Sequence, residues 1–317
     1  MIKSLCVAID HGNRNMKTPN FVFTTGVTSS DQKPGRGEKY LYYNNQYYML
    51  SEIRIPYRRD KTEESRFFVL TLFAIIMELE KLGNISEQDI AKVDLAIGLP
   101  PKHFPDLYEK YETFFKGTDG IINLTYTDRK YSISIQNVIA FPQDYAAMIT
   151  EYQSISEIPR AVGIDIGGFT TDYLVMRNGS EDMDYCDSLE LGIIKMYNRI
   201  LTTVNAEYDM LLEEKDIDSI IQGNHTYYDP PIIQLVEKQA ASFITDLLAT
   251  IREHSVDTKS TYTIFIGGGA LRLRKYIEAQ SSRLNRYTFI EDIHANAKGY
   301  QLLYQLLQFD KGSDANG

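Results

Sequence analysis

The stretch AVGIDIGGFTTD, residues 161–172, decides the fold. Its apolar first half predicts a buried strand, which ends on Asp165 and is followed closely by Gly167 and Gly168. A strand whose end turns through glycine exposes consecutive backbone N–H groups, and these bind phosphate oxygens with little hindrance from side chains. The stretch therefore predicts a phosphate-binding loop. Taken alone, a tight structural turn with a solvated aspartate explains it equally well.

The same plan occurs at the start of the chain. The strand-like run LCVAI, residues 5–9, delivers Asp10 into the loop DHGNRNMK, residues 10–17. Two strands that end on aspartate before glycine, half a chain apart, predict two similar domains facing a shared cleft. Two carboxylates meeting across a cleft suit a hydrated Mg²⁺, which prefers oxygen ligands and keeps several waters. Lys17 is placed to neutralise phosphate charge from the strand after the first loop.

A third glycine turn follows the strand TYTIFI, residues 261–266. Gly267, Gly268 and Gly269 let another group, such as an adenine ring or an α-phosphate, approach the backbone closely. A plain strand-to-helix turn is the alternative. The sequence contains no G-x-x-x-x-G-K-[ST], which excludes a P-loop, and GGGALR lacks the Rossmann fingerprint.

The remaining chain alternates between strand and helix patterns. The Tyr-rich segment 39–50 predicts a hairpin that turns at Asn44-Asn45, and it is interpreted either as a packed ribbon or as a subunit contact. The run Arg58–Lys61 is interpreted as a solvated loop, with a filament contact as the alternative. Strands are expected at 93–99, 120–126 and 130–135, helices at 63–81, 191–203 and 231–254, a polar connector at 154–160, a closing helix after residue 293 and an irregular tail at 310–317.

Composition bounds the function. The chain has 317 residues, with 33 basic and 43 acidic side chains and a net charge of −10. A protein that binds DNA over a broad surface needs a basic stripe, so any contact with DNA is expected to run through an adaptor protein. The two cysteines, Cys6 and Cys186, have no metal-ligand spacing and are expected to be reduced. No signal peptide is recognised, and Phe67–Met77 is too short to span a membrane, so the chain is expected to be cytoplasmic.

In order, five segments resemble the motifs of the actin-like ATPase superfamily, which includes actin, the large heat-shock chaperones and sugar kinases. AIDHGNRNMK resembles its first phosphate loop, NVIAFPQDYAA its first connecting helix and VGIDIGGFTTD its second phosphate loop. IFIGGGA resembles its adenosine motif and HANAKGYQLLY its second connecting helix. The first loop, the Tyr-rich hairpin, GLPPKHF and the lack of long insertions resemble the ParM/StbA plasmid-segregation actins.

The resemblance implies roles for particular residues. Asp10 and Asp165 are expected to hold Mg²⁺ through water, and Gln143 to orient the attacking water. Arg14 and Phe169 depart from the residues that are usual at these positions in the superfamily. The residues expected to bind the nucleotide are Gly12, Asn13, Arg14, Asn15, Lys17, Gly167, Gly168, Phe169, Thr170, Gly267, Gly268 and Gly269.

The resemblance also implies an α/β, two-domain actin-like fold, a duplicated ribonuclease H-like design with the nucleotide in the interdomain cleft. Domain I is expected at 1–158 plus 293–317, with a hairpin-bearing subdomain at about 31–84. Domain II is expected at 159–292, with a helical subdomain at about 193–257.

The function implied is a Mg-dependent ATPase that self-associates into filaments and segregates plasmid or other mobile DNA, with GTP as the alternative nucleotide. Two other functions remain open. A sugar-type kinase of the same fold needs a catalytic G-x-D motif, which the expected region lacks. A non-hydrolysing scaffold or chaperone-like binder needs a substrate-binding domain after the core.

Overall fold

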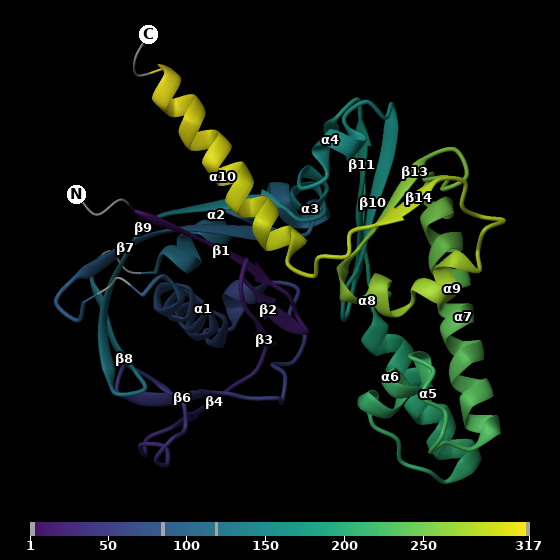
Figure 1. The fold of residues 1–317 in the computed structure, drawn as a ribbon, viewed down its shortest axis with the longest axis horizontal. Coiled ribbons are helices and arrows are strands. Elements are labelled where there is room, and N and C mark those ends of the chain that lie inside the picture. The colour runs from purple at the N-terminus through teal and green to yellow at the C-terminus, as the bar shows by residue number, and fades with distance from the viewer. Residues whose placement is uncertain (1–3, 84–85, 118–119, 315–317) are drawn as a thin grey trace. The chain divides into compact units, whose positions relative to one another are not determined.

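The computed structural model describes residues 4–83, 86–117 and 120–314. The chain divides into two compact units (Figure 1): unit 1 comprises residues 1–150 and 294–317, and unit 2 comprises residues 151–293. The stretch 154–160, expected to be a connector, belongs to unit 2. Helix α4 (Tyr152–Ile155) covers its beginning and strand β10 starts at Arg160.

Both units are built on the same five-strand plan. The five strands of the plan are counted here in chain order. In unit 1 the second strand pairs antiparallel with the first and with the third, and the fourth strand pairs parallel with the first and with the fifth. Unit 2 repeats these pairings. The strands, in sheet order, are β3 (Val22–Thr24), β2 (Asn15–Lys17), β1 (Leu5–His11), β7 (Ile90–Leu99) and β9 (Arg129–Pro142) in unit 1, and β12 (Ser180–Leu189), β11 (Thr171–Arg177), β10 (Arg160–Ile166), β13 (Tyr262–Ile266) and β14 (Tyr287–Phe289) in unit 2.

Unit 1 extends its sheet by four more strands. The expected Tyr-rich hairpin is confirmed: β5 and β6 turn at Asn44 and Asn45, whose φ angles of 47° and 60° are the left-handed values that such a turn needs. Their tyrosines pack on one another, with the Tyr42 and Tyr47 rings 4.6 Å apart. The added strands are β8 (Ile122–Tyr126), β5 (Leu41–Tyr43), β6 (Gln46–Leu50) and β4 (Val27–Ser30).

Helices cover both faces of the sheet in unit 1. The strands curl round α1 (Arg66–Leu82), whose buried side chains form the centre of the main core (Figure 1), and α2 (Phe104–Lys116) packs on the same core. Gly83, with φ of 70°, ends α1. The opposite face carries α3 (Tyr145–Ile149) and α10 (Ala295–Asp314). These helices touch closely: a Cβ on Gly299 would lie 1.9 Å from the Ala146 carbonyl oxygen.

The helices of unit 2 pack around one core between them and their sheet. Short 3-10 turns occur at Lys61–Glu63 and Pro101–His103 in unit 1. The expected helices at 191–203 and 231–254 are confirmed. The helices of unit 2 after α4 are α5 (Ile193–Tyr208), α6 (Glu214–Ile221), α7 (Pro230–Glu253), α8 (Gly267–Arg272) and α9 (Arg274–Glu278).

The expectation of an irregular tail is wrong for residues 310–314, because α10 continues to Asp314, whereas residues 315–317 lie outside the described residues. Within the described ranges, no helix is long and apolar enough to cross a membrane.

Candidate functional site

The first loop is a tight turn between β1 and β2. Asp10 pairs with Lys17 across the two strands, and the turn lies between them. Its shape requires glycine, because a Cβ on Gly12 would lie 2.5 Å from the Asn15 carbonyl oxygen. The side chain of Thr25 fixes the turn from below by donating a 2.6 Å hydrogen bond to the Gly12 carbonyl.

Asp10 is a buried carboxylate with both oxygens engaged. The Lys17 ammonium lies 3.2 Å from Oδ2, and the Gln143 amide Nε2 lies 3.2 Å from Oδ1. The residue is 3% exposed, and Gln143 is 8% exposed. The structure thus brings together three of the residues singled out in the sequence, one of them 133 positions away from Asp10 along the chain.

Gln143 is held in place by its backbone as well as by its side chain. It follows β9 directly, and its N–H donates to the Leu99 carbonyl at 2.8 Å. The next residue, Asp144, is buried with φ of 59°, and its N–H donates to the Asn296 side chain of α10 at 3.1 Å. A positive φ in a residue other than glycine stores strain that its surroundings must hold, and such strain collects at functional sites. The sequence pattern did not single out Asp144 or Asn296.

The turn also presents one buried polar atom to its surroundings. The Asn13 side-chain oxygen is buried and has no hydrogen-bond partner among the described residues. A buried amide without its partner is costly, so Asn13 is suited to bind a ligand or an ordered water. Arg14 is half-buried, and its carbonyl accepts from the Thr25 N–H at 3.1 Å.

Beneath the turn lies a buried basic pair. His11 is fully buried, its ring stacks on Phe115 at 4.2 Å, and its Nε2 is 2.9 Å from the Thr71 hydroxyl. The same hydroxyl lies 2.9 Å from the Phe67 carbonyl oxygen, to which it donates.

The second member of the pair is a lysine. The Lys61 ammonium donates to the His11 carbonyl and is 4% exposed, so the expected solvated loop at Arg58–Lys61 is wrong for this residue. Burial, and then the Lys61 charge, hold the pKa of His11 well below its ordinary value.

The second loop joins β10 to β11 and has its carbonyls bound by a helix. The backbone N–H groups of Ile193 and Ile194, in the first turn of α5, donate to the carbonyls of Gly167 and Gly168 at 3.1 Å and 2.8 Å. In a trans peptide the C=O and the following N–H point in opposite directions. The N–H groups of Gly168 and Phe169 therefore point away from α5, which is the arrangement that an anion-binding loop needs.

Two carboxylates and a hydroxyl lie at this loop. Asp165 and Asp172 are directly opposite each other on β10 and β11, so their side chains share one face of the sheet. The Thr170 hydroxyl lies 3.3 Å from Asp172 Oδ2. Like charges at opposite positions repel, and a cation between them relieves that repulsion. Phe169 is half-buried and packs on the core of unit 2.

The glycine turn after β13 packs on the same strand end. A Cβ on Gly267, whose φ is 87°, would lie 2.1 Å from Asp165 Oδ1, and one on Gly269 would lie 2.4 Å from the Ile166 carbonyl oxygen. A Cβ on Gly268 would meet nothing within 4 Å, and this residue is exposed. Gly267 and Gly269 are therefore needed for packing inside unit 2, whereas the surface at Gly268 is open to another group.

The structure thus gathers the sequence-predicted residues into two groups, one in each unit. The first loop, Lys17 and Gln143 lie in unit 1, and the second loop and the glycine turn lie in unit 2. No cluster of three or more His, Cys, Asp or Glu side chains with metal-binding geometry occurs in the described part of the chain. Sequence patterns missed Asp172, although its place seven residues after Asp165 mirrors that of Lys17 after Asp10.

Comparison with known proteins places both units in related families. Residues 8–145 match the family described as the N-terminal domain of actin-like proteins. Residues 163–279 match the C-terminal domain of the archaeal actin homologue family described as MreB-like. None of the curated proteins matches the chain.

Solved structures share the fold of nearly the whole chain. An archaeal actin homologue superposes with a TM-score of 0.77 at 16% identity, covering 95% of this chain and 99% of its own, and it has also been solved as a complex with ADP. The ParM of a 15-stranded filament from Clostridium botulinum gives 0.75 at 17%, covering 96% and 100%. The ParM of Bacillus thuringiensis, solved with ATP, gives 0.66 at 13%, covering 96% and 99%.

Two matched domain families, together with a shared two-unit fold, identify this chain as a member of the actin-like superfamily, similar to the ParM proteins and the archaeal actin homologues.

Proposed function

We propose that this chain is a Mg-ATP-dependent polymerising ATPase that segregates plasmid or other mobile DNA through filament assembly. One observation carries the proposal. The chain builds the same strand, turn and strand twice, and each turn has a glycine that its packing requires and an aspartate at the end of the first strand. A duplicated phosphate loop on an actin-like fold supports joint binding of one nucleotide by residues of both units.

The two loops supply complementary groups to such a nucleotide. The N–H groups of Gly168 and Phe169, turned away from α5, suit phosphate oxygens, and the Lys17 ammonium adds a positive charge. Gly268 offers an open backbone surface to the adenosine. Asp10 and Asp165 would hold Mg²⁺ through water, and the bound ion would neutralise charge on the terminal phosphates. Their oxygen donors fit that ion, because hydrated magnesium prefers carboxylates to nitrogen ligands.

Gln143 is suited to orient the attacking water. Its amide nitrogen is anchored on Asp10, which fixes the plane of the side chain and leaves the amide oxygen to accept a hydrogen bond. A neutral amide positions water without acting as a strong base, and phosphoryl transfer depends mainly on positioning and charge stabilisation. Slow hydrolysis of this kind suits a filament that must assemble before it turns over.

Assembly is proposed from the fold and from the relatives. The ParM of Clostridium botulinum was solved as a filament. In a polymerising ATPase, nucleotide binding shifts the subunit toward the conformation that assembles, and hydrolysis removes that bias. With a net charge of −10, this chain is expected to reach DNA through a basic adaptor protein.

The test is assembly of the purified chain with Mg-ATP. Light scattering should rise above a critical concentration and fall as ATP is consumed, while Mg-ADP should give much less signal. Electron microscopy with ATP and with GTP identifies the preferred nucleotide and any filaments. A protein that binds ATP tightly yet stays monomeric at every salt and nucleotide concentration would contradict the filament function.

Gln143→Ala separates hydrolysis from binding. Removing the group that orients the water should slow ATP hydrolysis, measured as the phosphate produced, about 100-fold or more. Loss of one positioned group in an active site has effects of this size. Affinity for ATP and assembly should be retained, which would give long-lived filaments. Gln305→Ala, on the exposed side of α10, is the matched control and should hydrolyse at the normal rate. An unchanged rate in Gln143→Ala removes this residue from the mechanism.

A further inference from the structure

Strand β9 loses its second neighbour halfway along its length. On one side it pairs with β7 from Ser132 to Pro142, whereas on the other side β8 pairs with it only from Arg129 to Ile133. From residue 134 onward, no strand in the described ranges pairs with this second side. The later half of β9 is therefore a free sheet edge inside an otherwise continuous nine-stranded sheet.

Two side chains of α2 bind backbone groups of this edge. The Lys116 ammonium donates to the Gln136 carbonyl, and the Ala140 N–H donates to Glu112 Oε1 at 2.9 Å. Gln136 and Ala140 therefore turn their backbone groups away from β7.

The residue between these two contacts is open. Strand residues alternate in direction, so the N–H and C=O of Val138 also point outward. Among the described residues nothing pairs with them. Val138 is therefore available to donate one backbone hydrogen bond and to accept another.

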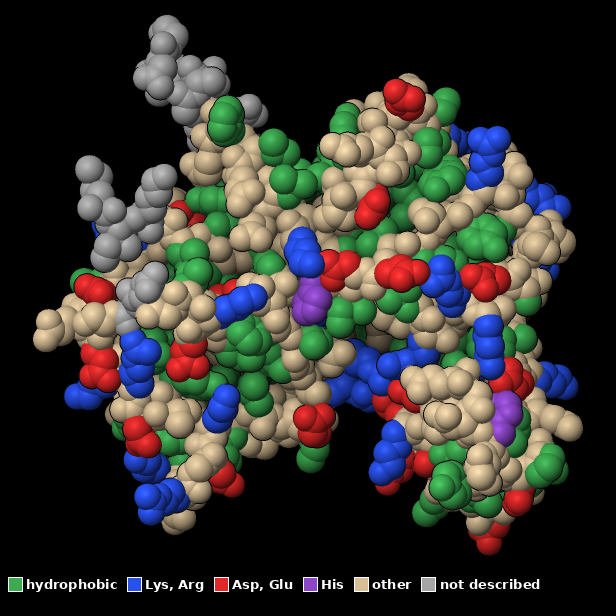
Figure 2. Space-filling model, in the orientation of Figure 1, with side chains coloured by type: hydrophobic (Ala, Val, Ile, Leu, Met, Phe, Trp, Pro, Cys, Tyr) green, Lys and Arg blue, Asp and Glu red, His purple; other side chains and the backbone are tan. Residues whose placement is uncertain are grey.

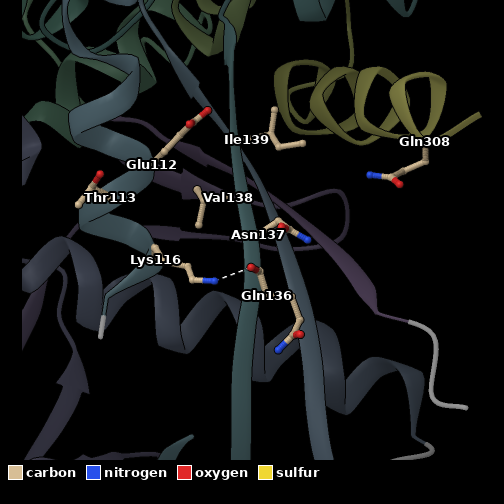
Figure 3. A pocket seen from close by; sticks show the side chains of 8 residues that line it. All are labelled: Glu112, Thr113, Lys116, Gln136, Asn137, Val138, Ile139 and Gln308. Atoms are coloured by element: carbon tan, nitrogen blue, oxygen red, sulfur yellow. Dashed lines mark hydrogen bonds between the residues drawn. The ribbon is translucent and has the colours of Figure 1, made fainter. Parts of the chain in front are cut away.

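A groove of about 540 Å³ opens along this edge (Figure 3). Its walls are α2 on one side and Gln308 of α10 on the other, with residues 136–139 of β9 between them. The side chain of Val138 packs toward the α1 and α2 core, whereas that of Ile139 packs with Tyr300 toward α10. The groove thus lies in the plane of the sheet, where an additional strand would have one helix on each face.

We propose that the free edge of β9 binds an extended segment of a partner protein as an added antiparallel strand. The added strand is taken as antiparallel, the arrangement in which Val138 exchanges both hydrogen bonds with a single residue of the partner. Backbone hydrogen bonds supply the binding, and side chains on alternate faces supply the specificity, as in other cases of strand addition.

The charges on α2 specify the partner sequence. In an antiparallel strand centred on Val138, the residue two positions before the centre lies opposite Ala140, beside Glu112, and favours a basic side chain. Gln136 is the extra residue of a bulge against β7, and the partner residue two positions after the centre reaches this bulge beside Lys116, which favours an acidic side chain there. The partner segment therefore has a basic residue four positions before an acidic one.

The two intervening residues face the α10 side of the sheet, where one lies opposite Ile139 and the other opposite the polar Asn137. Ile139 lies in the groove, and Leu307 and Phe309, which flank Gln308 on α10, are 40% and 81% exposed. Figure 2 shows hydrophobic side chains along the projecting turns of α10. Valine or another β-branched residue at these two positions would bury that surface and favour the extended conformation.

The probe is a fluorescent peptide, Ser-Arg-Val-Thr-Val-Glu-Ser, measured by fluorescence anisotropy with the full chain. Two matched peptides test the two halves of the argument. One exchanges Arg and Glu, and the other carries an N-methyl group on the central Thr, which removes the N–H that would meet the Val138 carbonyl. Both should bind about 10-fold more weakly. Equal binding of all three peptides, or of none, overturns the proposal.

Variants of the chain test the same contacts from the other side. Val138→Pro removes the outward N–H without touching the ladder to β7, and proline is tolerated where a strand N–H faces away from its sheet. This variant should bind the probe peptide about 10-fold more weakly. Lys116→Glu should reverse the preference and favour the charge-exchanged peptide. If the proline variant fails to fold, this reversal decides the question, and its absence means that the two side chains only protect the edge from aggregation.

Discussion

The two units carry the same hairpin with opposite charges at one matching position. In unit 1 the strand-end Asp10 pairs with Lys17, and in unit 2 the strand-end Asp165 pairs with Asp172, each seven residues later. The first pair is an ion pair with a 3.2 Å contact between a buried carboxylate and a half-buried ammonium. The second puts two carboxylates on one face. A duplicated scaffold has thus diverged into one half whose added charge suits phosphate and another whose added charge suits a cation.

Among the tests of this comparison, the largest effect is expected from removing these charges. Lys17→Met should lower the affinity for ATP about 10-fold to 100-fold, because a charged hydrogen bond to a phosphate contributes about 1.5–3 kcal/mol. Asp172→Asn should leave that affinity nearly intact at saturating Mg²⁺ and raise the Mg²⁺ concentration that is needed. Titration calorimetry with a non-hydrolysable ATP analogue at several Mg²⁺ concentrations measures both. If both variants behave alike, the two halves have not diverged in this way.

Alanine substitutions in the glycine turn test which of its glycines is needed for packing inside unit 2. Gly269→Ala places a Cβ 2.4 Å from the Ile166 carbonyl oxygen and should destabilise unit 2 by about 1–3 kcal/mol. Gly268→Ala meets open space, so it should leave the denaturant midpoint unchanged or slightly raised.

Nucleotide binding completes this test. If adenosine lies on this surface, Gly268→Ala should lower the affinity for ATP. Gly269→Ala should lower that affinity only because it destabilises unit 2. A Gly268→Ala protein with normal stability and normal ATP affinity would exclude the turn from the binding site.

The smallest effect is a pH dependence confined to unit 1. Burial holds the pKa of His11 below its ordinary value of 6.5, so the unfolded chain takes up a proton that the folded chain does not. The stability from neutral His11 is fully present above that value and falls by about 1.4 kcal/mol for each pH unit below it. Urea unfolding at pH 7.5 and 5.5 should show this loss, and His11→Gln should reduce it. An equal loss in the variant assigns the pH dependence to other groups.

Local patterns in the sequence were enough to predict the strand before each glycine loop, the turn at Asn44-Asn45 and helices α1, α5 and α7, because apolar periodicity and turn residues act over a few positions. They also placed Asp10 and Asp165 at strand ends. They did not indicate β3, β4, β12, β14 or helix α2. Contacts between distant segments were not predictable in this way. The Gln143 bond to Asp10 spans 133 residues, and only the pairing of β1, β7 and β9 in one sheet brings the two together.

Charged residues misled the interpretation most. Arg58–Lys61 has the composition of a solvated loop, yet Lys61 is buried because the folded unit gives its ammonium a carbonyl to bind. Asp172 likewise gave no signal of its own in the sequence, since an aspartate near the start of a strand is common in proteins without any functional role. Its meaning came from the ladder that places it opposite Asp165.

The buried Lys61 has a consequence for local opening. Its ammonium binds the His11 carbonyl, one residue from Asp10, although Lys61 itself belongs to the segment that follows the Tyr-rich hairpin. Moving that segment outward would strip the carbonyl of its partner and expose the first turn. Opening of the segment around Lys61 and exposure of the turn at residues 12–14 are therefore coupled through this one hydrogen bond.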